Sequence, residues 1–239
     1  MKTLIIIPCY NEENRLPIQD FIHFFKAEQE DIRFLFVNDG STDNTINILN
    51  DLEKRFQVVR VLDLKQNVGK AEAVRTAMLK SVSTDFDYIC YFDADLATPL
   101  EEIYQFIAKA EKYNPLVIMG SRVKLLGITK IKRKWHRHYF GRVFATIASN
   151  MLKIPVYDTQ CGAKMIKASI IKELFASPFI SSWLFDVEML FRLKNLQVYN
   201  QSQTPIIELP LTRWEDKGDS KFPLSYLFKF PFELIRIYL

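Results

Sequence analysis

The sequence lacks the features that mark disulfide-linked, secreted and membrane-spanning proteins. Only three of its 239 residues are cysteines, and their wide spacing fits neither a disulfide framework nor a zinc site. No run of about eighteen apolar residues occurs, so we expect no membrane-spanning helix. We also expect no signal peptide, because acidic residues follow the apolar segment 4–7 too closely. These absences favour a cytoplasmic protein with reduced thiols.

Acidic residues are missing from one segment of the chain. Between Arg122 and Tyr157 there are nine lysines and arginines but no aspartate or glutamate. Subtracting these nine charges from the net charge of +4 leaves −5 for the rest of the chain. Such a segment indicates an anionic partner, which is phosphate, nucleic acid or a membrane surface. The alternative is a solvated helix face, which usually carries acidic residues as well.

Apolar segments and amphipathic segments alternate along the first half. Segments rich in β-branched and aromatic residues predict strands at 4–7, 33–37, 58–62, 88–92 and 116–119. Apolar residues at helical spacing predict helices at 16–27, 45–56, 70–82 and 101–112. The alternation predicts an α/β fold with a Rossmann-like, mostly parallel sheet and helices on both faces. Ligands of such sheets bind beyond the carboxyl ends of the strands.

The second half is less regular. We expect helices at 135–152 and 183–193, a compact loop at 157–162, and short strands near Val198 and at 206–209. Without repeats or a low-complexity linker, one domain over 1–221 followed by an extension over 222–239 is the simplest organisation. The extension is amphipathic and aromatic, which predicts either a membrane-interface helix or a helix packed on the domain.

Asp93-Ala94-Asp95 follows the strand predicted at 88–92 and is the strongest local signal for chemistry. Two carboxylates at this spacing can face one small volume, where they repel each other and any phosphate. Mg²⁺ or Mn²⁺ relieves the repulsion by taking oxygen ligands from carboxylates, phosphates and water. Such a cation neutralises charge on a departing diphosphate. The alternative is an aspartate that caps the helix beginning near Pro99.

Polar residues also follow the first two predicted strands. Pro8, Tyr10 and Glu12 come after the first strand, and Asp39 comes after the second. Tyr10 could lie against a nucleotide base, and the two carboxylates could accept hydrogen bonds from ribose hydroxyls or from a uracil N–H. For Glu12, an acid in the first turn of a helix is the alternative.

Two basic residues lie at the same predicted edge of the sheet. Lys70 follows Gly69 at the start of a helix, a position that suits a diphosphate, although plain surface exposure is the alternative. Arg122 follows the fifth predicted strand, where its planar guanidinium suits phosphate.

Taken together, these segments resemble the family 2 glycosyltransferases. The segments that match in order and spacing are 7–13, 38–43, 93–95 and 120–122. Segments of the second half are similar to the dolichyl-phosphate β-glucosyltransferases, namely 158–164, 183–188 and 214–221. The resemblance implies a GT-A fold, a nucleotide-sugar donor such as UDP-glucose, Mg²⁺ or Mn²⁺, and a polyprenyl-phosphate acceptor.

The resemblance also implies roles for individual residues. Pro8, Tyr10, Glu12 and Asp39 would hold the nucleotide, together with the segment 93–95. Asp95, with Asp93, would bind the metal ion. On the acceptor side, the residues that would meet the phosphate are Arg122, Ser220 and Lys221. Two further residues follow from their positions and not from the resemblance: Lys70 at a helix start for the nucleotide, and Arg137 of the basic segment for the acceptor phosphate.

The acceptor decides whether the reaction needs a general base. A phosphate monoester is largely ionised near neutral pH and can attack the anomeric carbon directly, which inverts the configuration. A saccharide hydroxyl would need a base, for which Asp158 and Asp186 are the candidates, although Asp186 could equally be a helix-start acid. The other hypotheses are a soluble transferase acting on a saccharide and a non-catalytic module that binds a nucleotide sugar or anionic lipid.

Aromatic and basic residues are mixed in two segments, around Trp135 and in the extension. Such mixtures suit a membrane interface and not a membrane span. We therefore expect a peripheral protein at the inner face of the cell membrane. We expect no nucleic-acid partner, because the basic residues lie next to a phosphate-shaped site.

Overall fold

The computed structural model describes residues 1–27, 31–82, 85–132, 135–217 and 226–238. For 132, 135–140, 226–228 and 230–231 it describes the backbone and not the side chain. The boundary predicted between residues 221 and 222 therefore lies outside the described residues.

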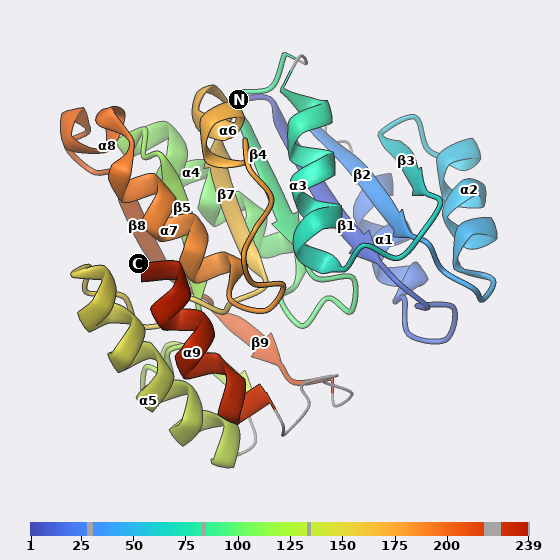
Figure 1. Cartoon of the computed structure of the whole chain (residues 1–239). Helices are drawn as coiled ribbons and strands as arrows, with labels where there is room; N and C mark the ends of the chain where they lie inside the picture. The colour runs from blue at the N-terminus through green and yellow to red at the C-terminus, as the bar shows by residue number, and fades with distance from the viewer. Residues whose placement is uncertain (28–30, 83–84, 133–134, 218–225, 239) are drawn as a thin grey trace.

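A seven-stranded sheet forms the centre of the molecule, in the order β3-β2-β1-β4-β7-β5-β8 (Figure 1). Its strands are β1 (Thr3–Cys9), β2 (Ile32–Asp39), β3 (Val59–Leu64), β4 (Tyr88–Phe92), β5 (Val117–Ser121), β7 (Ala163–Lys167) and β8 (Ile206–Pro210). β1 pairs in parallel with β2 and β4, β2 pairs in parallel with β3, and β5 with β8. The predicted mostly parallel sheet is confirmed, and each strand expected in the first half is present.

β7 departs from the parallel pattern and was not expected. It lies between β4 and β5 and is antiparallel to both. Two lysines, Lys164 and Lys167, interrupt its apolar residues, so the segment does not read as a buried strand. Lys164 is nevertheless fully buried. The central strand β7 was therefore missed because its charged residue Lys164 is buried with a partner, Asp186.

Helices cover both faces of the sheet, as the alternation predicted (Figure 1). One face is covered by α1 (Ile18–Lys26), α2 (Thr45–Arg55) and α4 (Ile103–Tyr113), the last preceded by the 3₁₀ turn η1 (Leu100–Glu102). Phe21, Leu49 and Phe106 anchor these helices in one core. The other face is covered by α3 (Lys70–Ser81), α6 (Ala168–Leu174) and α7 (Phe185–Asn195). Their core includes Ala77 and Leu190.

Two helices lie outside these layers, α5 (Trp135–Leu152) and α9 (Tyr226–Tyr238), and both contact α7. Leu234 of α9 is buried, at 1% exposure. A second sheet of two parallel strands joins β6 (Lys130–Lys132) to β9 (Arg213–Glu215). No helix in the described part of the chain is both long enough and apolar enough to cross a bilayer.

The strand expected near Val198 is wrong, because this residue lies in the short helix α8 (Gln197–Gln201). The backbone N–H of Ser202 donates to the carbonyl of Val198 at 3.1 Å, which closes a helical turn. A single β-branched residue among polar neighbours gives no period-two pattern, so local hydrogen bonding decides the conformation.

Candidate active site

The carboxyl ends of β1, β2 and β4 point to one edge of the sheet, where the predicted polar loops gather (Figure 1). Hydrogen bonds join the first two loops. The N–H of Asn11 donates to Ser41 Oγ at 3.1 Å, and the N–H of Thr42 donates to Asn11 Oδ1 at 2.9 Å. The N–H of Glu12 donates to Thr45 Oγ1 at 2.8 Å. These bonds hold the predicted nucleotide loop against the end of β2.

Asp39 connects the end of β2 to the loop before α3. Its two carboxylate oxygens accept hydrogen bonds from the N–H groups of Val68 and Gly69, at 2.8 and 3.0 Å. The turn after it requires glycine, because a Cβ on Gly40 would lie 2.4 Å from the Asn67 nitrogen. Burial raises the pKa of Asp39 despite the two backbone donors, which lower it. Asp39 thus shapes this loop, and a nucleotide would use its remaining lone pairs.

Asp93 lies at the centre of the edge. Its carboxylate forms an ion pair with the ammonium of Lys70, the first residue of α3. Its N–H donates to the Gly162 carbonyl at 3.0 Å, in the loop before β7. A Cβ on Gly162 would lie 1.7 Å from Asp93 Oδ2. The loop before β7 therefore approaches Asp93 as closely as glycine permits, a role that the sequence alone did not reveal.

Asp95 is the second carboxylate of the pair and is partly buried. Its Oδ1 accepts a hydrogen bond from the N–H of Ala97 at 3.0 Å. Burial, followed by the negative charge of Asp93, raises the pKa of Asp95. The two carboxylates thus repel each other in a partly buried place, and a divalent cation bound by both would relieve that repulsion.

The donor set at this edge fits Mg²⁺ or Mn²⁺ that is shared with a ligand. Within the described residues, no cluster of three or more His, Cys, Asp or Glu side chains could hold a metal ion. Asp93 and Asp95 would thus supply two carboxylates and leave the remaining positions to phosphate oxygens and water. Mg²⁺ is usually held in this way, by one or two carboxylates plus substrate phosphates.

Arg122 and Asp158 form a buried ion pair at the far side of the same edge. Arg122 Nε and Nη2 donate to the two Asp158 oxygens at 2.6 and 2.7 Å, and the Arg122 N–H also donates to Asp158 Oδ2. The guanidinium lies 5.3 Å from the centre of the Trp214 ring. Burial lowers the pKa of Arg122, but Asp158 raises it by more. Arg122 was predicted as a phosphate ligand and Asp158 as a candidate base, and the structure pairs them with each other.

Asp186 belongs to a second buried cluster, which reaches across the sheet. It forms an ion pair with the ammonium of Lys164, at 2.8 Å, and accepts a hydrogen bond from the Tyr91 hydroxyl. Tyr91 and Lys164 are register partners on β4 and β7, two residues before Asp93 and two after Gly162. Burial and Asp186 raise the pKa of Tyr91 well above its usual value. Tyr91 and Lys164 were not predicted, because their shared partner Asp186 is distant from both in the sequence.

Of the remaining predicted residues, those that the structure describes in full lie at or beside this edge. Pro8, Tyr10 and Glu12 are at the end of β1, where the Glu12 carboxylate lies 3.6 Å from Arg15 Nε. Ala94 is buried between the two aspartates. Ser220 and Lys221 lie outside the described residues, as does the side chain of Arg137 on α5. Their predicted roles stay predictions.

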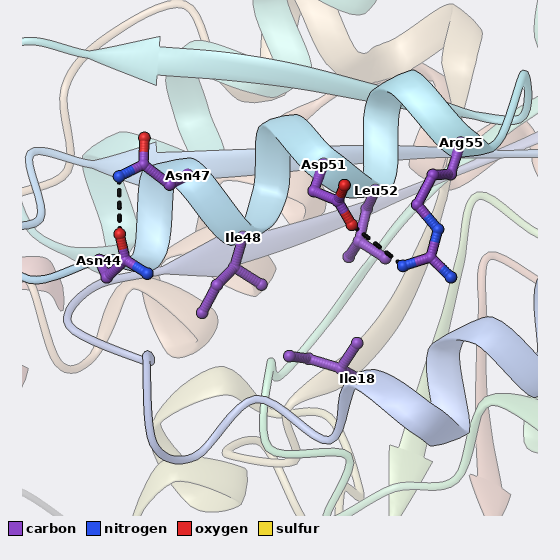
Figure 2. Close-up of a pocket in the computed structure, with 7 residues that line it drawn as sticks. All are labelled: Ile18, Asn44, Asn47, Ile48, Asp51, Leu52 and Arg55. Carbon is purple, nitrogen blue, oxygen red and sulfur yellow. Dashed lines mark hydrogen bonds and ion pairs between the residues drawn. The ribbon is translucent and has the colours of Figure 1, made fainter.

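A groove of about 330 Å³ lies elsewhere, between α1 and α2 (Figure 2). Its polar side chains bind one another: Asn47 donates to Asn44 at 2.6 Å, and Arg55 donates to Asp51 at 3.0 Å. The centre of the groove is lined by the apolar residues Ile18, Ile48 and Leu52. It contains none of the predicted site residues, and its charged groups are already paired.

The chain is similar to known proteins over most of its length. Residues 4–175 match the model of glycosyl transferase family 2. A dolichyl-phosphate beta-glucosyltransferase of Dictyostelium discoideum is 30% identical, over 98% of this chain and 72% of its own length. One from Trichomonas vaginalis is 29% identical, over 98% of this chain and 70% of its own length.

Solved structures share the fold. Glucosyl-3-phosphoglycerate synthase from Mycobacterium tuberculosis, in complex with Mn²⁺ and UDP-glucose, superimposes with a TM-score of 0.67 at 15% identity. The match covers 99% of this chain and 77% of that structure. The sheet and its covering helices therefore form a GT-A-like fold. Because the family model matches most of the chain, the chain belongs to glycosyl transferase family 2.

Proposed function

We propose that this protein is an inverting glucosyltransferase that moves glucose from UDP-glucose to a polyprenyl phosphate, with Mg²⁺ or Mn²⁺ held by Asp93 and Asp95. The observation that carries the proposal is the meeting of Asp39, Lys70, Asp93 and Asp95 at the carboxyl edge of the sheet. The names of the relatives that align over nearly the whole chain support this donor and this acceptor.

The donor side can be assigned from the loops that surround Asp93. The nucleotide would lie over the ends of β1 and β2, beside Pro8, Tyr10, Glu12 and Asp39. The diphosphate would lie toward Asp93, where Lys70 also reaches. When bound, the divalent cation would neutralise the leaving diphosphate. Asp93 and Asp95 would orient that charge, and Lys70 would add a second positive group.

The acceptor side supports a phosphate more than a hydroxyl. A hydroxyl acceptor needs a general base within reach, and the base needs a free lone pair and a suitable pKa. Asp158 is engaged by Arg122 through both oxygens, and Asp186 is engaged by Lys164 and Tyr91. Carboxylates held by cations are weak bases. A phosphate, which attacks without a base, suits this edge better.

The direct test is a transfer assay with purified protein, Mn²⁺, several UDP- and GDP-sugars, and either a polyprenyl phosphate or free saccharides. We expect a glucolipid, identified by mass, only with UDP-glucose and the polyprenyl phosphate. Consumption of sugar nucleotide with saccharides alone would overturn the acceptor assignment. Binding of UDP-glucose without turnover on any acceptor would instead favour a binding module.

We further propose that the protein works peripherally at the cytoplasmic face of a membrane, where a polyprenyl phosphate resides. Large apolar side chains are exposed near basic residues in the second half: Leu126 is 91% exposed, Phe232 75% and Ile128 71%. Such side chains can enter the headgroup region, while lysines and arginines attract anionic lipid.

Vesicle sedimentation tests the membrane contact. The double variant Phe232→Ser, Ile235→Ser removes two exposed apolar groups of α9, and Tyr113→Ser on α4 is a matched control away from this region. We expect binding to vesicles with anionic lipid, weakened several-fold in the double variant and unchanged in the control. Equal binding by all three proteins would exclude α9 as the contact.

A further inference from the structure

Lys70 is paired with the same carboxylate to which the proposed function assigns a metal ion. Its ammonium contacts Asp93 Oδ1, and both side chains are partly exposed, at 40% and 36%. The Asp186 and Asp95 carboxylates also act on this ammonium.

We propose that Lys70 is an internal counter-ion, which holds Asp93 in the metal-free protein and competes with the divalent cation for it. This inference rests on the proposed metal site. In the absence of nucleotide, the cation must displace an ammonium before Asp93 can become a ligand. With a nucleoside diphosphate present, the displaced ammonium gains the diphosphate as a new partner, so nucleotide and metal bind cooperatively.

The charges around Asp93 explain why a local cation is needed. Asp93 and Asp95 are two residues apart, and Asp186 lies near the same lysine. Lys164 is committed to Asp186 and to the Cys161 carbonyl, at 2.8 and 2.7 Å, and it is fully buried. It cannot serve Asp93 without leaving an unpaired charge inside the protein. Lys70 balances the Asp93 carboxylate from a partly exposed position.

The position of Lys70 also allows it to leave. It is the first residue of α3 and follows Gly69, whose φ is +84°. The space beside Gly69 is open, because a Cβ added there would meet no atom within 4 Å. A lysine has a flexible four-carbon stem and a compact charge, so its ammonium can move by rotation about side-chain bonds alone. The Phe185 ring, with its centre 6.0 Å from Nζ, is a further surface that favours a cation.

The experiment measures Mn²⁺ binding by electron paramagnetic resonance or calorimetry, with and without UDP, and does not depend on turnover. Lys70→Gln removes the charge, and Lys70→Arg keeps it at the same position. Lys65→Gln is the matched surface control, because Lys65 pairs with Asp63 and is 88% exposed. Asp95→Asn identifies the metal site itself.

Without UDP, we expect Lys70→Gln to bind Mn²⁺ about tenfold more tightly than wild type, and Lys70→Arg and Lys65→Gln to match wild type. With Mn²⁺ present, we expect Lys70→Gln to bind UDP about tenfold more weakly. Unchanged or weaker Mn²⁺ binding by Lys70→Gln, at a site that Asp95→Asn abolishes, would overturn this inference and leave the proposed function standing. Wild type that binds no Mn²⁺ even with UDP would overturn the metal site and this inference together.

Discussion

The two halves of the site edge treat their charges differently. Around β1, β2 and β4, Asp93 and Asp95 lie together with Lys70 paired to Asp93, and burial together with the Asp93 charge raises the pKa of Asp95. Around β5 and β7, Arg122 is paired with Asp158 and Lys164 with Asp186, and all four side chains are at most 14% exposed. In the proposed function, the first half receives the divalent cation. In the second half each charged side chain is already paired, and the ion pairs fix the positions of Arg122 and Lys164.

The largest effect that this comparison predicts is at Asp95. Asp95→Asn removes one of the two carboxylates that would bind the cation, so we expect transfer to fall at least about 100-fold, the scale of losing a main electrostatic contact to developing charge. Steady-state transfer of labelled glucose measures it. Asp51→Asn, on the exposed face of α2, is the control and should retain wild-type activity. Activity within a few-fold of wild type in Asp95→Asn would remove the metal assignment.

Gly162→Ala tests the contact between the two halves. The new Cβ would overlap the Asp93 carboxylate, so Asp93 must move. A shift of about 1 Å in a positioning group can cost about 100-fold, and we expect kcat/KM to fall 10- to 100-fold. Gly127→Ala, in an exposed loop, is the control for backbone strain without overlap, because its φ of +75° strains an alanine while a Cβ there meets nothing within 4 Å. Normal kinetics in Gly162→Ala, with a folded protein by circular dichroism, would show that the position of Asp93 is not critical.

In the second half, Asp158→Asn should affect stability more than chemistry. Leaving Arg122 without its carboxylate is expected to lower the free energy of unfolding by about 3 kcal/mol, measured by urea denaturation. A general base contributes about 100- to 10,000-fold, so turnover within tenfold of wild type would exclude that role. We expect Asp186→Asn likewise to lower stability more than turnover, because it leaves Lys164 without its carboxylate. Near-total loss of turnover in a folded variant would favour a hydroxyl acceptor.

The smallest predicted effect is a pH shift in metal binding. Only ionised Asp95 binds the cation, and its folded-state pKa is raised by burial and by Asp93. Mn²⁺ affinity should therefore begin to fall, on acidification, at a pH above the value near 3.9 at which an ordinary aspartate is half protonated. Calorimetric titrations at a series of pH values measure this. An affinity that stays constant down to that pH would contradict the assignment of Asp95, with its raised pKa, as a metal ligand.

The same contrast explains what the sequence could predict. In the loops after β1, β2 and β4, the polar residues of the candidate site are close together in the sequence, as Asp93 and Asp95 are. Each of these loops directly follows an apolar segment that is recognisable as a strand. In the buried clusters around Asp158 and Asp186, the partners are far apart in the chain: Arg122 is 36 residues from Asp158, and Tyr91 is 95 residues from Asp186. One-dimensional periodicity does not encode such pairs. β7 was not predicted because Lys164 is a charged residue in a buried position, where its distant partner Asp186 neutralises it.

The antiparallel placement of β7 has a consequence for how the protein is made. β4 ends at Phe92 and β5 at Ser121, yet the strand that joins them into one sheet begins only at Ala163. During synthesis, the nascent chain therefore carries both strands before the segment that bridges them has emerged from the ribosome. The backbone of Gly162, which fixes Asp93, arrives with that segment. The surroundings of Asp93 therefore cannot take their final form until residues 162–167 have been synthesised.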